Sequence, residues 1–97
     1  MAASRGDRDD PRVETLRRAV TRLRAELDAH PADLRDRREA ERELDALEAA
    51  ARTGALDVET LRRALLLLTA ALGSVSALTR PLGEVRSAID LFGVAPR

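Results

Sequence analysis

The chain has 97 residues, 17 of them basic and 17 acidic, so its formal net charge is zero. A neutral chain has no global field that would attract DNA or an anionic membrane. It contains no Cys, Trp or Tyr and one Phe, which excludes disulfides and thiolate metal sites and leaves Leu, Val and Ala to fill a thin core.

Residues 1–9 are small, charged and without hydrophobic periodicity, and we predict a disordered leader. They hold no apolar segment of the kind that a secretory signal requires, so we expect a cytoplasmic protein. Asp10 and Pro11 supply the N-cap and the first residue of the first predicted helix. His30 and Pro31 end this helix. Between them the apolar residues recur at helical spacing along one face, at Val13, Leu16, Val20, Leu23 and Leu27.

A second helix is predicted from about Pro31 to Arg52, with Gly54 as a left-handed residue after its end. Its charged residues include opposite pairs four apart, such as Arg35 and Glu39, which are typical of a solvated helix face. Its apolar stripe is narrow and consists of Ala40, Leu44, Leu47 and Ala51. The residues that flank the apolar stripe are mainly Arg on the first helix and mainly acidic on the second. Because opposite charges attract, we expect these two helices to pair with each other, as an antiparallel hairpin.

The third predicted helix starts after Asp57 as N-cap and continues through Val75. No charge occurs in the 16 residues between Arg63 and Arg80, a length of about 24 Å that is too short for a membrane span. Besides its core stripe, this helix has a second uncharged face on roughly the opposite side, at Leu66, Leu67, Ala70, Gly73, Ser74 and Ala77. Two such faces require two partners.

Arg80 and Pro81 mark either a kink or the start of a separate fourth helix. The last apolar stripe is closed by Gly93, and residues 94–97 are expected to fray. This stripe consists of Leu82, Val85, Ile89 and Phe92. The fourth helix covers either all of the second face of the third helix or only part of it, and another chain then covers the rest.

The heptapeptide VETLRRA occurs at 13–19 and again at 58–64. Two copies 45 residues apart are too few for a solenoid, which needs about three units. A similar amphipathic helix start in a biased composition explains most of the match, and the rest is open to a second explanation, an old duplication of a helical hairpin. In neither case is the repeat a functional site.

Catalytic and metal-binding patterns are missing. The single histidine, His30, has only Glu26 and Asp33 nearby as further ligands, so a capping or exposed histidine is favoured over a metal ligand. There is no nucleophile elbow and no phosphate-binding glycine loop. We therefore predict no enzyme activity, cofactor or metal. Arginines on the first helix give nucleic-acid binding as the alternative function, which the missing aromatic residues disfavour; they are Arg12, Arg17, Arg18, Arg22 and Arg24.

The C-terminal part of the chain resembles segments of small, uncharacterised actinobacterial helical proteins. The resemblance rests on Gly73 to Leu78, then Pro81-Leu82, Val85, Ala88-Ile89 and Leu91-Phe92-Gly93. It is also similar, more loosely, to helical accessory domains of bacterial conflict systems. That similarity implies a protein that associates with itself or with an effector protein.

These observations predict an all-α protein with one domain over 10–93, a helical bundle of three long helices plus a shorter C-terminal helix, with the third helix central. We expect an interaction or assembly module that forms a homodimer or another homo-oligomer through the third and fourth helices. An effector protein is a further expected partner, and a membrane is not. The interface is predicted to contain Leu66, Leu67, Ala70, Gly73, Ser74, Ala77 and Phe92.

Overall fold

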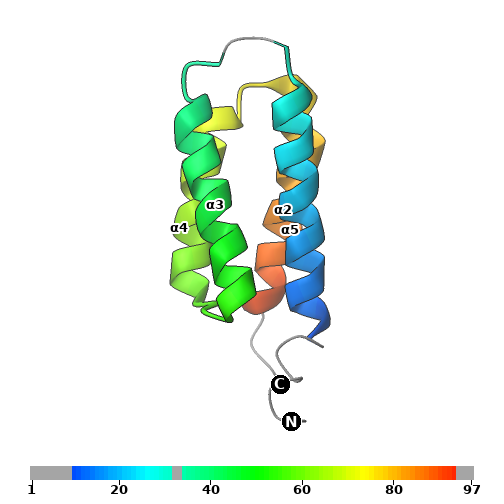
Figure 1. Cartoon of the computed structure of the whole chain (residues 1–97), viewed down its shortest axis with the longest axis vertical. Helices are drawn as coiled ribbons and strands as arrows, with labels where there is room; N and C mark the ends of the chain where they lie inside the picture. The colour runs from blue at the N-terminus through cyan, green and yellow to red at the C-terminus, as the bar shows by residue number, and fades with distance from the viewer. Residues whose placement is uncertain (1–9, 32–33, 94–97) are drawn as a thin grey trace.

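The computed structural model describes residues 10–31 and 34–93, which form four α-helices that run alternately up and down (Figure 1). No strand occurs among these residues. The elements are α2 at Pro11–Ala29, α3 at Arg37–Thr53, α4 at Val58–Leu72, a short 3-10 turn η2 at Ser76–Leu78, and α5 at Thr79–Gly93. The predicted leader at 1–9 and tail at 94–97 lie outside the described residues.

The helices form a four-cornered bundle in which each helix packs against two neighbours (Figure 1). α2 contacts α3 and α5, and α4 contacts the same two helices. The all-α helical bundle is thus confirmed, but two details differ from the prediction. The third helix, α4, is not central, because it has the same number of neighbours as the others. The last helix, α5, has 15 residues and is as long as α4.

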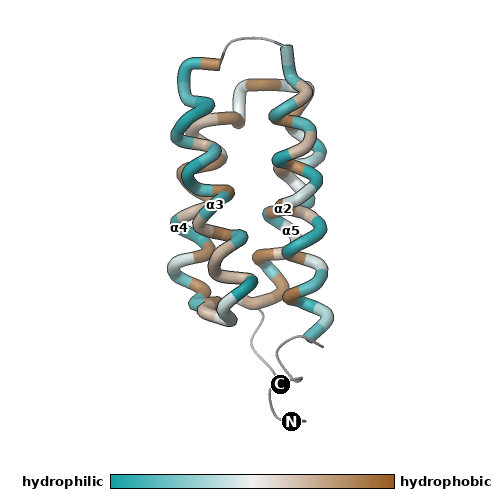
Figure 2. The backbone as a smooth tube through the Cα atoms, viewed as in Figure 1, coloured by the Kyte–Doolittle hydropathy of each residue, from teal (hydrophilic) through white to brown (hydrophobic). Residues whose placement is uncertain are grey.

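Most residues of the predicted apolar stripes lie in one buried core, which also includes Ala19, Ala64, Leu78 and Ala88. Figure 2 shows hydrophobic segments recurring along all four helices. No polar or charged residue is buried in the described part of the chain. Leucine dominates because it combines a good helix propensity with a large apolar side chain. The largest fully buried side chains are Leu16, Leu23, Leu27, Leu44, Leu47, Leu61, Leu68, Leu72, Leu78 and Ile89, with Val20 and Val85.

Three helix ends form as their sequences predict. The Asp10 side chain accepts a hydrogen bond from the backbone N–H of Arg12, and the Asp57 side chain accepts one from Thr60. Both carboxylates satisfy N–H groups that have no partner inside the helix. Gly54 follows α3 with φ of 82°, a left-handed conformation that glycine adopts without a steric penalty.

The start of α3 differs from the prediction. The helix begins at Arg37, several residues after Pro31, and its N-cap Asp36 makes no side-chain capping bond. Arg37 instead reaches back to α2, where its guanidinium donates to the carbonyls of Leu27 at 2.8 Å and His30 at 3.0 Å. A cation is favourable at this helix end, because unpaired carbonyls and the helix dipole make it negative.

The connection between α4 and α5 resolves the alternative at Pro81. α4 ends at Leu72, and α5 is a separate helix with Pro81 in its first turn, where the missing N–H costs no helical hydrogen bond. Pro81, Leu82, Val85, Ala88 and Ile89 of α5 are buried.

The repeated heptapeptide lies at the starts of α2 and α4, which occupy diagonally opposite corners of the bundle (Figure 1). Its leucines, Leu16 and Leu61, are completely buried. Its last residues, Ala19 and Ala64, are also buried, whereas its Glu and Arg residues are exposed. The repeat therefore specifies equivalent core positions on two helices.

Candidate functional site

The outward surface of α4 carries an apolar patch. We call it the α4 outer face and define it as Leu66, Leu67, Ala70, Gly73 and Ser74. Four residues of α4 are buried in the core: Leu61, Ala64, Leu68 and Leu72. Since the sequence has no charge between Arg63 and Arg80, the outward side of α4 is uncharged from Ala64 onward, whereas its first turns carry exposed Glu59, Arg62 and Arg63.

Leu66 and Leu67 are the most exposed large hydrophobic side chains on α4, with 69% and 42% of their surface accessible. Successive residues of a helix are about 100° apart, so these two leucines diverge and Ala70 lies between them. Ala70, Gly73 and Ser74 are exposed too. Within a single chain, neither α5 nor any other described element covers this face.

Two predicted interface residues lie in other surroundings. Ala77 is exposed within η2, in the connection that follows the α4 outer face. Phe92 is half-buried near the end of α5, and the guanidinium carbon of Arg12 lies 5.0 Å from its ring centre, a cation–π contact. Phe92 thus belongs to the junction of α2 with α5.

The backbone of the same chain leaves no room for a side chain at Gly73. A Cβ atom at this position would contact the backbone carbonyl of Thr69 at less than van der Waals distance. The absence of a side chain at the end of α4 is therefore required whether or not another helix approaches.

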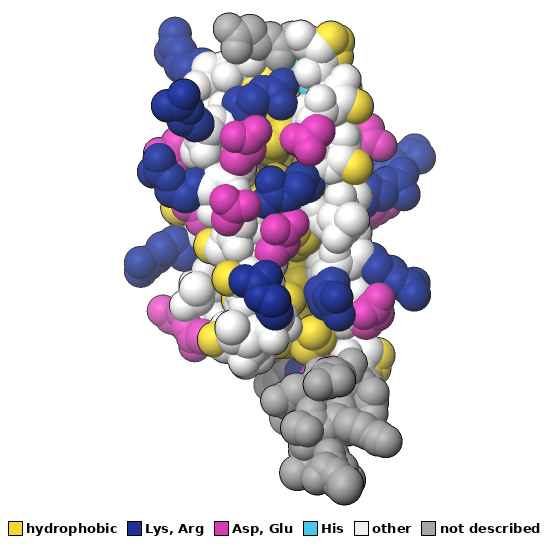
Figure 3. All heavy atoms as spheres, in the orientation of Figure 1, with side chains coloured by type: hydrophobic (Ala, Val, Ile, Leu, Met, Phe, Trp, Pro, Cys, Tyr) yellow, Lys and Arg dark blue, Asp and Glu magenta, His cyan; other side chains and the backbone are white. Residues whose placement is uncertain are grey.

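A groove that sequence reasoning missed lies between α2 and α3, near the start of α2. It has a volume of about 770 Å³, and its apolar lining includes Val20, Leu47, Ala51, Leu56 and Phe92. Figure 3 shows apolar side chains in this seam with basic side chains on both sides. The signal in the sequence was the narrow stripe of α3, because alanine near its C-terminal end does not fill the space to α2.

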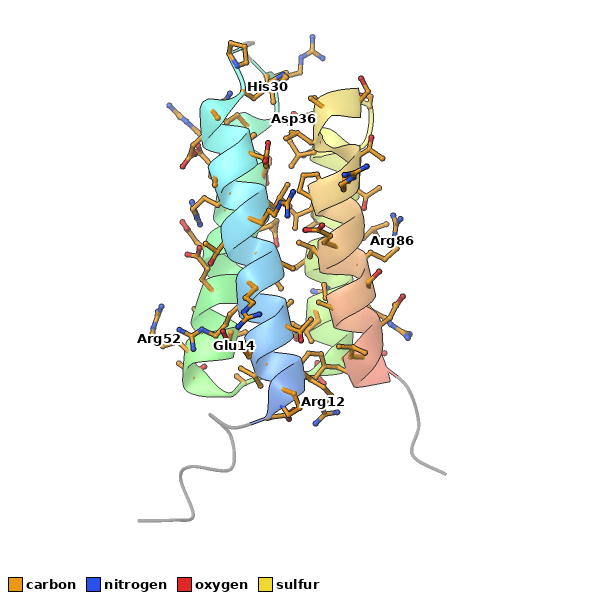
Figure 4. All side chains as sticks on the ribbon, turned by 90° about the vertical axis from the view of Figure 1, so that its right-hand side faces the viewer. Arg12, Glu14, His30, Asp36, Arg52 and Arg86 are labelled. Atoms are coloured by element: carbon orange, nitrogen blue, oxygen red, sulfur yellow. The ribbon has the colours of Figure 1, made fainter. Side chains whose placement is uncertain are left out.

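Charged groups at this groove are partly neutralised by pairing. Asp10 accepts hydrogen bonds from the backbone N–H of Arg12 at 2.9 Å and from its Nη2 at 2.8 Å. The side-chain bond is the main cause that lowers the pKa of Asp10 below its ordinary value of 3.8. In Figure 4, Arg12 lies at the junction of α2 with α5, whereas Arg52 lies on the α3 side.

Arg24 joins α2 to α3, as the predicted pairing of basic and acidic edges requires. Its Nε lies 2.9 Å from Glu48 Oε2 and its Nη2 lies 2.6 Å from Asp45 Oδ1. The hydrogen bond to Glu48 is the main cause that raises the pKa of Arg24. The α2–α3 hairpin is therefore confirmed, although α2 packs more extensively against α5.

Every arginine of the basic run on α2 has an acidic neighbour. Apart from Arg24, the pairs are Arg12 with Asp10, Arg17 and Arg18 with Glu14, and Arg22 with Glu84 of α5. Most of these carboxylates come from the segment that starts α2 or from α5, rather than from α3 as the sequence suggested. The run is thus not a strip of unpaired positive charge.

The described ranges contain no metal-binding cluster and no membrane-spanning helix. His30 is the C-cap residue of α2, and its carbonyl accepts a bond from Arg37. Among residues 10–31 and 34–93 there is no cluster of three His, Cys, Asp or Glu placed to hold a metal ion, and Asp33 lies outside them. None of the helices described is both long and apolar enough to cross a bilayer.

The comparison with known proteins agrees with the expected resemblance to an uncharacterised family. No curated protein matches the chain, and no solved structure does. The profile of one family, described as a family of unknown function, matches residues 5–93 and thus almost the whole sequence. The chain belongs to this family, DUF5955.

Proposed function

We propose that this protein is a non-enzymatic assembly module that associates with a second copy of itself through the α4 outer face. The observation that supports this proposal is the exposure of Leu66 and Leu67, at 69% and 42%, on a helix whose other leucines are buried or half-buried. Adjacent exposed leucines on one helix are a feature of surfaces that bind another protein.

A second copy of α4 is the occupant that suits this face. In an antiparallel pair with Ala70 at the twofold axis, Leu66 and Leu67 of each copy pack against Gly73 and Ser74 of the other. Such a self-complementary arrangement is what a twofold interface requires. Small residues let the two helices approach closely and increase dispersion contacts.

The expected association is weak. Together Leu66 and Leu67 expose about one leucine side chain per copy. Full burial of a leucine contributes about 1.5–3 kcal/mol, so the four side chains of a dimer contribute roughly 3–6 kcal/mol. Because association costs at least about 4 kcal/mol in lost translational and rotational freedom, we expect a dimer that dissociates on dilution.

Sedimentation equilibrium over a range from low micromolar to near millimolar protein tests the proposal. Leu67→Glu should give a monomer at every concentration, because dimerisation would bury a charge. Leu91→Glu is the matched control, since Leu91 is 41% exposed but lies on α5. It should associate like the unmodified protein. A monomeric unmodified protein at the highest concentration, or equal effects of both substitutions, would refute self-association through α4.

An effector protein is the second occupant proposed for the same face, which is the role that the similarity to accessory domains of bacterial conflict systems implies. An actinobacterial origin and a cytoplasmic location are part of the same proposal. Binding of nucleic acid is not proposed, because the five arginines of α2 all have carboxylates within ion-pair distance. A salt-dependent shift of labelled DNA by the purified protein would overturn this choice.

A further inference from the structure

The groove between α2 and α3 is a second surface feature, and it is independent of the α4 outer face. No residue of α4 lines it. Its lining on α2 extends from Arg12 to Thr21, which corresponds to about 14 Å along a helix. A volume of about 770 Å³ is within the range of pockets that bind one small molecule.

The apolar end of the groove is formed where three elements meet. Ala51 comes from the last turns of α3, Leu56 from the connection to α4, and Phe92 from α5. These three residues are only partly buried. A ligand that lies against them would remove apolar surface from water.

The groove carries a surplus of positive charge. Both acids that line it are already paired: Asp10 binds Arg12, and Glu48 binds Arg24 through two hydrogen bonds of 2.9 and 3.2 Å. Two further arginines line the groove, Arg17 and Arg52.

Among the described residues, Arg17 on the α2 side forms an ion pair with Glu14 alone, at 3.7 Å, and Glu14 also lies 3.3 Å from Arg18. One carboxylate thus serves two guanidinium groups. Arg52, on the α3 side, has no ion pair with any residue in the described ranges. An anion held between these two arginines would be complementary to both walls of the groove.

We propose that this groove binds a monomeric alkyl carboxylate, with the carboxylate between Arg17 and Arg52 and the alkyl chain against Ala51, Leu56 and Phe92. The two guanidinium groups donate hydrogen bonds to the carboxylate, and the apolar residues bury the chain. Neither the arginines nor the apolar residues alone would bind the ligand tightly. The groove is open to water on one side, so the apolar residues bury only part of the alkyl chain, and exposed ion pairs are weak.

Titration of the full chain with decanoate below its micelle concentration, followed by amide NMR, tests this proposal. Saturable shifts centred on Ala51 and Leu56 are expected. Acetate, which lacks the chain, and decyltrimethylammonium, which has the opposite charge, should each bind at least about tenfold more weakly. Equal binding of the cationic ligand, shifts centred on α4, or no saturable binding of decanoate would overturn the proposal. So would binding to anionic vesicles without binding to monomeric decanoate.

Variants separate the two parts of the groove. The double substitution Arg17→Gln and Arg52→Gln should weaken decanoate binding about tenfold or more. The matched control, Arg38→Gln with Arg86→Gln, removes two exposed arginines outside the groove and should leave binding unchanged. Figure 4 shows Arg86 on α5, pointing away from the bundle.

A third variant, Ala51→Leu, should fill the apolar end and abolish binding while the circular dichroism of the helices is retained. Unchanged binding in this variant would refute the location. Because Leu67→Glu alters only α4, it should bind decanoate like the unmodified protein, whatever its oligomeric state.

Discussion

Gly83 provides a direct test of the helical packing, because replacing it with alanine should stabilise the protein. Gly83 is within α5, after the first turn, and a Cβ atom placed there would meet no atom within 4 Å apart from its chain neighbours and the backbone of its own helix. Glycine inside a helix loses more backbone freedom on folding than alanine does. The added methyl group therefore has a favourable effect and no steric cost.

The expected gain is about 0.5–1 kcal/mol in the free energy of unfolding. For a domain of this size, that corresponds to a melting temperature about 2–8 °C higher. Thermal unfolding followed by circular dichroism at constant protein concentration measures the change. A constant concentration is needed because self-association would itself raise the melting temperature.

Gly54→Ala is the matched control, and its effect should have the opposite sign. Gly54 has φ of 82°, where a Cβ atom costs roughly 1–2 kcal/mol. If Gly83→Ala lowered the melting temperature, or if both substitutions acted in the same direction, the course of α5 and the reasoning from its open surroundings would be refuted.

Three further predictions concern the core, the end of α2 and the start of α2. Leu23→Ala should lower the free energy of unfolding in urea by about 2–5 kcal/mol, because Leu23 is completely buried; a loss under about 1 kcal/mol would contradict its core position. Arg37→Met should cost about 1–3 kcal/mol by leaving two carbonyls of α2 without their donor, whereas Arg38→Met, on the exposed neighbour, should be nearly neutral. The pKa of Asp10 is lowered in the folded protein, so its charge stabilises the fold above its ordinary value of 3.8 and this contribution disappears as the pH falls through the lowered value. The unmodified protein should therefore melt above Asp10→Asn at neutral pH and together with it in strong acid, and a constant difference at all pH values would contradict the pairing.

Features that depend on neighbouring residues in the sequence could be predicted. Asp10, Asp57 and Gly54 act at helix ends through bonds or backbone angles that involve only a few adjacent residues. The apolar stripes were also predictable, because burial on one side of a helix imposes a period of 3.6 residues. These local rules account for the four helices and for most of the core.

Features that depend on distant residues could not be predicted in the same way. Opposite charges four apart predicted ion pairs within the second helix, but Arg37 of that helix bonds carbonyls of α2, which are close only after the chain has turned. Heptad edges predicted the contact of α2 with α3. They did not predict the more extensive packing of α2 on α5, because that packing depends on how all four helices close the bundle.

The α4 outer face and the groove between α2 and α3 also differ in how far the sequence could predict them. The second apolar face with Leu66 and Leu67 could be predicted from the lack of charge between Arg63 and Arg80, but whether the fourth helix covers that face was left open, and the structure shows it exposed. The groove beside Ala51 required the distance between α2 and α3, which no pattern in a single sequence provides. Arg17 had been considered only as part of the basic run on the first helix, and Arg52 only as the end of the second helix.

The contact of Arg12 with Phe92 has a consequence for chain connectivity. It places the start of α2 beside the end of α5, at one end of the bundle (Figure 1). Joining these ends with a short linker and opening the chain between Gly54 and Asp57 would leave each helix with its present two neighbours. The bundle should therefore tolerate circular permutation, because the faces of its helices, rather than their order along the chain, determine which pairs form.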